Sequence, residues 1–320
     1  MNDPISDPIK DQLRDLPLVK APDSIWASIE ASLDPSLDQG VGSRESARRP
    51  WWVWGFSSAV ACGLAILGWY GTRPPKAAWD VVRLDGSPSV GLRAMGISDK
   101  IAVGEWLQTD ASSRARINVS DIGTVEVAPN TRVRLVASRP GEQRLRLAQG
   151  EIHASVTAPP RLFFVDTPAS TAVDLGCAYT MKADQDGNGV LQVTLGWVSL
   201  EWEGRESLVP AGASCRTRPK IGPGTPLFDD APPELAKALE DFDFNRGGEA
   251  ALDTVIAQAR VRDTLTLWHL LSRVEPLARQ RVYNRIVDLV PLPKAVSAEK
   301  VLQLDAETLK VWREELAWKW

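Results

Sequence analysis

Arginines recur in pairs, with one residue between the two members, at three places in the middle of the sequence. On a strand, the two members of each pair would point to the same face, because successive side chains alternate between faces. If the three strands are neighbours, the guanidinium groups would form a patch able to hold an anionic glycan or a lipid headgroup. The alternative is a solvated sheet face balanced by nearby carboxylates. The six residues are Arg114, Arg116, Arg132, Arg134, Arg144 and Arg146.

Two of the three cysteines, Cys177 and Cys215, lie in the same part of the chain, whereas Cys62 lies in an apolar run. In an oxidising compartment Cys177 and Cys215 could form a disulfide, and otherwise they would be two buried free thiols. Their spacing matches neither a zinc motif nor a CxxC motif. The sequence therefore predicts no metal site and no redox centre.

The residues that most often perform catalysis do not form a convincing set. The segment Asp184 to Gly189 matches the first half of a calcium loop, but Leu195 stands where that loop needs glutamate, so a hairpin turn is the better interpretation. His153 and His269 lie in separate patterns, and neither a catalytic triad nor a phosphate-binding glycine motif is present. We predict a protein that is not an enzyme and uses no cofactor.

An apolar run at residues 51–71 contains no charged residue and has tryptophans near both ends. About 21 helical residues cover the ~30 Å hydrocarbon core of a bilayer, and tryptophan suits the two headgroup layers. The sequence therefore predicts one transmembrane helix at 50–71. Three arginines precede the run and two basic residues follow it, which favours a cytoplasmic N-terminus.

The segment before this run, residues 1–49, contains one amphipathic stripe. Its apolar residues fall on one side of a predicted helix. So short a segment has too few large apolar groups for its own core, so the stripe is expected to dock on a partner protein or on a membrane surface. Basic residues are scarce on this helix, which favours a protein partner. The stripe residues are Ile25, Trp26, Ile29 and Leu33.

The rest of the 320-residue chain divides into two patterns. Residues 79–218 contain short alternating runs separated by turn residues, which predicts an all-β antiparallel meander, sandwich or roll. After a linker rich in proline and glycine at 219–232, apolar residues at 233–320 recur every three or four positions, as in an all-α helical bundle. The net charge is −4 and no segment is strongly basic, so direct nucleic-acid binding is not expected.

Several motifs of the β region resemble the FecR domain, in the same order and over residues 79–218. Cys177 and Tyr179 stand where that family usually has threonine and phenylalanine. The motifs that carry the resemblance are Val103 to Thr109, Leu147-x-x-Gly150-Glu151-Ile152, Val165 to Pro168, Gly176 to Tyr179, Val193 to Val198 and Val209 to Gly212.

The resemblance implies a single-pass regulator of the inner membrane. Members of that family bind an extracytoplasmic-function sigma factor through a short cytoplasmic N-terminus and receive a signal through an external, periplasmic β domain. We therefore expect a sigma factor on the stripe around Trp26, and an envelope protein or glycan as the outer partner. A second hypothesis is a membrane-tethered envelope scaffold or glycan-binding protein that has no sigma-factor partner.

Overall fold

The computed structural model describes residues 77–320. The predicted segment at 1–49 and the predicted transmembrane helix at 50–71 lie outside the described residues. The stripe residues Ile25, Trp26, Ile29 and Leu33 lie outside them as well.

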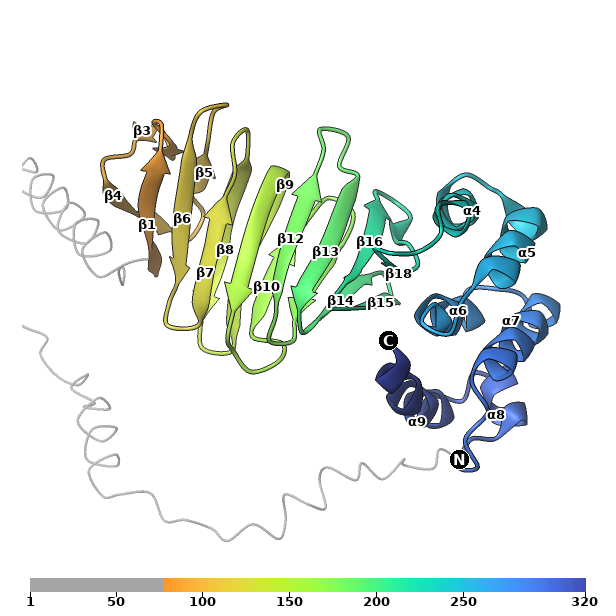
Figure 1. The fold of residues 1–320 in the computed structure, drawn as a ribbon. Coiled ribbons are helices and arrows are strands. Elements are labelled where there is room, and N and C mark those ends of the chain that lie inside the picture. Colours follow the sequence, from red (N-terminus) through yellow and green to blue (C-terminus); the bar gives the residue numbers. More distant parts are fainter. Residues whose placement is uncertain (1–76) are drawn as a thin grey trace, which may run out of the picture. The chain divides into compact units, whose positions relative to one another are not determined.

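The described chain begins with 18 strands that pair into two layers (Figure 1). The first sheet has the order β4–β1–β6–β7–β9–β12–β13–β16, and two short strands, β17 and β18, pair with β16. Its strands other than β9 are β1 (Ala78–Asp85), β4 (Ser98–Ala102), β6 (Arg114–Val119), β7 (Gly123–Val127), β12 (Ala178–Ala183), β13 (Gly189–Leu195), β16 (Ala213–Arg218), β17 (Gly222–Pro223) and β18 (Leu227–Phe228).

The second sheet has the order β3–β2–β5–β8–β9–β10–β11–β14–β15. Its strands other than β9 are β2 (Ser89–Val90), β3 (Arg93–Ala94), β5 (Trp106–Gln108), β8 (Arg132–Arg139), β10 (Phe163–Asp166), β11 (Thr171–Asp174), β14 (Trp197–Trp202) and β15 (Arg205–Pro210).

One long strand, β9 (Glu142–Val156), belongs to both sheets. Its first half pairs with β8 and β10, and its second half pairs with β7 and β12. The strand passes from the second sheet to the first at Gly150, which has φ +96°. Gly150 lies so close to Thr131 that a Cβ on it would be 2.3 Å from Thr131 Oγ1. Only glycine fits this position.

The core lies between the two sheets, because apolar and polar residues alternate along their strands. In β6, for example, Ala115, Ile117 and Val119 are buried while Arg114 and Arg116 are exposed. The predicted alternation is thus confirmed here. The sheets are not entirely antiparallel, however, since β9 and β10 run parallel.

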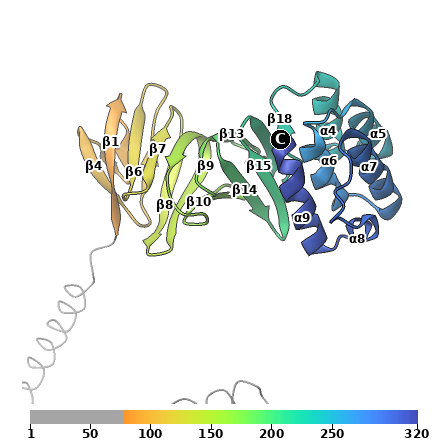
Figure 2. The same cartoon turned by 60° about the horizontal axis from the view of Figure 1, so that its bottom comes forward.

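Helices follow the strands and pack against the end of the sheets formed by β15, β16 and β18 (Figures 1 and 2). Pro233 and Pro276 occupy first-turn positions, where a missing N–H costs nothing, and Asp305 caps its helix by accepting from Thr308 N at 2.9 Å. The elements are α4 (Pro233–Phe244), α5 (Gly248–Gln258), α6 (Thr264–Leu271), α7 (Pro276–Leu289), α8 (Ala298–Leu302), α9 (Ala306–Leu316) and the 3₁₀ turn η1 (Ala317–Lys319).

The predicted fold class is wrong. The helices do not form a separate all-α bundle domain: residues 74–320 are one compact unit dominated by strands, and Leu265 of α6 is buried in the core of the sheets. The prediction failed because helical periodicity reveals which face of a helix is buried, but not that a neighbouring sheet covers it. Within residues 77–320 no helix is long and apolar enough to cross a membrane.

Candidate functional site

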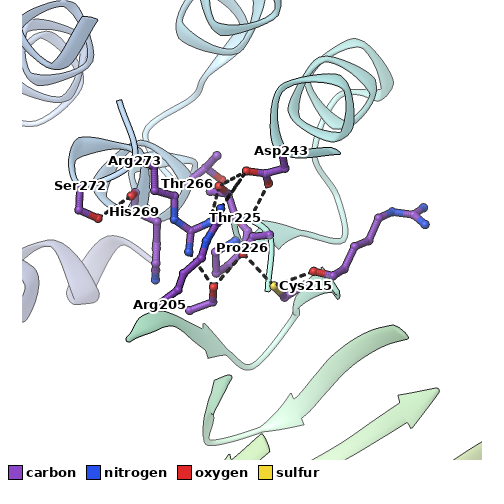
Figure 3. Close-up of polar contacts among 12 residues, drawn as sticks. Arg205, Cys215, Thr225, Pro226, Asp243, Thr266, His269, Ser272 and Arg273 are labelled. Atoms are coloured by element: carbon purple, nitrogen blue, oxygen red, sulfur yellow. Dashed lines mark hydrogen bonds and ion pairs between the residues drawn. The ribbon is translucent and has the colours of Figure 1, made fainter. Parts of the chain in front are cut away.

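A buried polar network joins the last strands to the helices (Figure 3). The sheet side contributes β15 and the connection between β17 and β18, and the helical side contributes α4 and the end of α6. We call this network the junction, and its residues are Arg205, Ser207, Thr225, Asp243, His269 and Arg273. Because these residues come from distant parts of the chain, the junction exists only when the helices are packed on the sheets.

Arg273 is the centre of the junction. Its Nη1 donates to Thr225 Oγ1 at 2.7 Å, and its Nη2 donates to Ser207 Oγ at 2.7 Å and to the carbonyl oxygen of Glu206 at 3.0 Å. The side chain is only 8% exposed. Burial lowers the pKa of Arg273 to about 10, so the guanidinium remains charged at neutral pH.

Asp243 supplies the negative charge of the junction, and its side chain is 3% exposed. It accepts hydrogen bonds from Thr225 N at 2.6 Å and from Thr225 Oγ1 at 3.1 Å. Its Oδ1 lies 3.5 Å from Arg205 Nη2 and 4.0 Å from Arg273 Nη1. One carboxylate thus faces two guanidinium groups, and the loss of either arginine would leave a buried charge poorly compensated.

His269 of α6 connects to the edge of the second sheet. Its Nε2 accepts from Leu208 N of β15 at 3.0 Å, which requires the proton on Nδ1, and Nδ1 lies 2.8 Å from the carbonyl oxygen of Leu265. Burial, followed by the nearby Arg273 charge, lowers the pKa of His269 to about 3. The imidazole is therefore neutral, and both nitrogens are occupied, so it stabilises the packing and cannot act as a general base.

A cluster of tryptophans forms a second contact between sheet and helices. The ring of Trp320 lies 5.9 Å from that of Trp197 in β14 and 6.4 Å from that of Trp268 in α6, measured between centroids. Trp320 Nε1 also donates to Thr264 Oγ1 at 3.1 Å. Trp320 packs against the core between the sheets and also against a second cluster of buried apolar side chains, which lies among the helices. One side chain thus connects the two clusters.

The junction has the chemistry of a structural connection. Its histidine is neutral and fully hydrogen-bonded. Arg273 bonds two hydroxyls and one carbonyl oxygen, and Arg205 contacts the Asp243 carboxylate at 3.5 Å. Across residues 77–320 there is no group of three or more histidine, cysteine, aspartate or glutamate side chains placed to hold a metal ion. What the arrangement can do is make the sheets and the helices move together.

The structure does not bring the six predicted arginines together. Arg114 and Arg116 lie on β6 of the first sheet, where they pair with Asp85 and Glu126, each at 2.6 Å. The other four lie on β8 and β9 of the second sheet. Of these, Arg144 contacts Glu142 at 2.7 Å and Asp166 at 2.6 Å.

Two arginines of the second sheet lie close to Trp106, and Arg146 lies on the next strand, opposite Arg134. The guanidinium of Arg132 lies 4.1 Å from the Trp106 ring centroid and that of Arg134 lies 5.6 Å from it, which are cation–π distances. Arg146 approaches a carboxylate only at 3.9 Å, to Asp166 Oδ2. The positive charge is thus concentrated on one face and around one aromatic ring.

Cys177 and Cys215 are free, buried thiols. The two cysteines lie on either side of β13. Cys215 is opposite Leu191 of β13. Ala178, the residue after Cys177, is opposite Leu195, which is four residues further along β13. The two cysteines are therefore separated by roughly 10 Å across two strand spacings and by roughly 13 Å along the strands, too far for a disulfide. Cys177 Sγ donates to the buried Asp174 Oδ2 at 2.7 Å, and Cys215 Sγ donates to the Gly224 carbonyl oxygen at 3.1 Å.

The sequence analysis missed the junction residues. Ser207 and Arg273 are 66 residues apart, and no local spacing connects them. In the sequence analysis, His269 is considered only as a possible member of a catalytic triad. A histidine or arginine placed among the apolar positions of a helix was the one available signal, because such a residue is seldom buried without a partner.

A family model described as FecR protein matches residues 105–199. The resemblance to the FecR domain is thus confirmed for these residues. The FecR region runs from the residue before β5 into β14 and includes the residues where β9 changes sheets. Two of its motif glycines have clear structural roles: Gly150 at that change, and Gly196, where a Cβ would lie 2.2 Å from the Gly176 carbonyl oxygen.

Two solved structures resemble part of the chain. Both are crystal structures of a protein from Parabacteroides distasonis ATCC 8503 that is provisionally described as an anti-sigma factor, and both are 17% identical with a TM-score of 0.34. The similarity covers 42% of this chain and 63% or 62% of the other, so less than two thirds of that protein is matched. No curated protein matches the sequence.

Proposed function

We propose that the protein is a FecR-like regulator that binds an extracytoplasmic-function sigma factor. The docking surface is the amphipathic stripe around Trp26, and the β unit receives the signal that changes this binding. The FecR match at residues 105–199 carries the proposal. The sequence pattern supports it, since the spacing of Ile25, Trp26, Ile29 and Leu33 predicts one apolar helical face in a segment with few other large apolar residues.

Because the junction joins the sheets to the helices, both are expected to respond together when a signal binds. A ligand that moves β15 must also move Arg273 and His269, because both are hydrogen-bonded to that strand or to its side chains. Sheets and helices are therefore expected to act as one rigid element rather than as two hinged domains.

Capture of the full-length protein from native cells tests the proposal. The tagged chain should recover a sigma factor identifiable by mass spectrometry, and Trp26→Ala should abolish that recovery while Trp26→Phe retains part of it. Trp318→Ala is the matched control, because Trp318 is 87% exposed in the described part of the chain. Recovery of no sigma factor by the wild-type protein, or equal recovery by Trp26→Ala, would contradict the proposal.

A further inference from the structure

The outer face of the second sheet carries a row of aligned side chains. The row crosses seven strands, β5–β8–β9–β10–β11–β14–β15, of which several are visible side by side in Figure 2. Strand pairing places its members opposite one another, one per strand. In that order they are Trp106, Arg134, Arg146, Asp166, Thr171, Glu201 and Glu206.

Charge is distributed unevenly along this row. Arg134 and Arg146 lie in its first half, and Arg132, two residues before Arg134 on β8, extends the positive end. Glu201 and Glu206 lie in the second half, and Glu203 in the β14–β15 turn extends the negative end. The face is thus positive on one side of β10 and negative on the other.

Pairing within the chain leaves most of these charges available. Within residues 77–320, neither Arg132 nor Arg134 has a carboxylate within 4.0 Å, and neither Glu203 nor Glu206 has a basic group within that distance. Glu201 is held by Arg161 at 3.0 Å. Asp166, near the middle of the row, is neutralised by Arg144 at 2.6 Å.

The two halves also differ in shape. The negative half contains a groove of about 690 Å³ that has Phe164 and Val173 among its apolar lining residues. Its charged lining residues are three glutamates and two arginines: Glu201, Glu203, Glu206, Arg144 and Arg205. The positive half carries Trp106, which is partly exposed and lies below the Arg132 guanidinium. A large aromatic side chain next to arginines is the composition that dominates protein interfaces.

We propose that this face is the interface of a homodimer. A two-fold axis parallel to β10, the middle strand of the seven, exchanges the two ends of the row and keeps the positions along the strands aligned. Arg134 then faces the partner's Glu201, Arg132 faces the partner's Glu203, and Trp106 faces the partner's groove. The same contacts form twice, as a two-fold axis requires.

The size of the face predicts a weak dimer. Seven strands spaced by ~4.8 Å and about five residues of ~3.3 Å each give roughly 500 Å² per copy, so about 1,000 Å² in total, the lower limit for a specific interface. Exposed charge pairs contribute more to specificity than to affinity and are screened by salt. The dimer should therefore be weakened by raising the salt concentration.

A charge-swap experiment on the full-length protein tests the proposal by sedimentation velocity. At a protein concentration on the order of 50 µM in low salt, the wild type should be a dimer. The double variants Arg132→Glu/Arg134→Glu and Glu201→Arg/Glu203→Arg, which alter the charges that face each other across the axis, should each be monomeric. Mixed together, these two variants should associate again, because each supplies the charge that the other lacks. Arg114→Glu/Arg116→Glu, which alters exposed arginines of the first sheet, is the matched control and should remain dimeric.

Three outcomes would overturn the proposal. These are a monomeric wild type, dimers that persist in both double variants, and variants that do not associate when mixed. If the wild type is monomeric and binds dextran sulfate, while the Arg132→Glu/Arg134→Glu variant does not, the positive half holds an anionic polymer instead. Circular dichroism of each variant confirms that loss of association is not loss of folding. The test involves no sigma factor, so its result is independent of the proposed function.

Discussion

Arg273 Nη2 donates a 2.7 Å hydrogen bond to Ser207 Oγ, and this bond connects the end of α6 to β15 across 66 residues of sequence. Ser207 Oγ in turn donates to the Gly224 carbonyl oxygen at 2.8 Å, so the chain of hydrogen bonds extends to the segment that precedes β18. The helices are thus held to the sheets by a buried charge as well as by apolar packing.

Replacing Arg273 with methionine should destabilise the protein strongly. The change leaves Asp243 buried with only Arg205 nearby, and breaking a buried ion pair costs on the order of 3 to 5 kcal/mol. Urea denaturation should report this loss. Arg116→Met removes an exposed pair with Glu126 and should cost less than about 1 kcal/mol. Similar losses in the two variants would show that the junction does not stabilise the fold.

Gly150→Ala should be far more damaging than Gly141→Ala. Both glycines have positive φ, +96° and +80°, so both variants incur backbone strain of roughly 1 to 2 kcal/mol. Only at Gly150 does the new Cβ meet another backbone, at 2.5 Å from Thr131 Cα, whereas Gly141 faces open space. The difference in unfolding free energy should reach about 2 kcal/mol or more, and soluble yield gives the comparison if Gly150→Ala does not fold. Equal effects would mean that the strand passes Thr131 less closely.

The neutral His269 should make stability fall as pH is lowered. Its pKa is about 3 when folded and about 6.5 when unfolded, so the unfolded chain binds the proton first. The stabilisation is therefore complete above about pH 6.5 and decreases towards pH 3. Between pH 7 and pH 5 the wild type should lose about 2 kcal/mol more than His269→Gln in urea denaturation. Parallel curves for wild type and His269→Gln would contradict a buried, neutral His269.

Cys177 and Cys215 should resist alkylation in the native protein. Burial raises the pKa of Cys215 to about 12, and burial with the neighbouring Asp174 carboxylate raises the pKa of Cys177, so neither forms a thiolate at pH 8. Peptide mapping after iodoacetamide treatment should find both peptides unmodified until denaturant is added. A disulfide-linked pair of peptides, or rapid native labelling, would be inconsistent with the structure.

Much of the β unit could be predicted from the sequence, because a half-buried strand leaves a period of two in its residues. Ala115, Ile117 and Val119 form such a pattern. The pairing of strands could not be predicted, since register and order depend on distant partners. A patch of all six arginines required their strands to be neighbours, and the sequence does not show that β6 and β8 belong to different sheets.

The packing of the helices could not be predicted for a related reason. The apolar face of α6 could pack against other helices or against a sheet, and the sequence pattern is the same in both cases. In the structure, Leu265 is buried among strands. Arg273 and Asp243 stand beside apolar residues, but local sequence does not show that the two side chains are partners. Only the three-dimensional arrangement reveals that they meet.

Direct titration of the captured sigma factor into the full-length protein tests the central claim most simply. Isothermal calorimetry should give one-to-one binding by wild type and by Trp318→Ala, and a loss of at least tenfold in affinity, about 1.4 kcal/mol, for Trp26→Ala. No binding by the wild-type protein, or an unchanged affinity for Trp26→Ala, would contradict the proposed regulatory function.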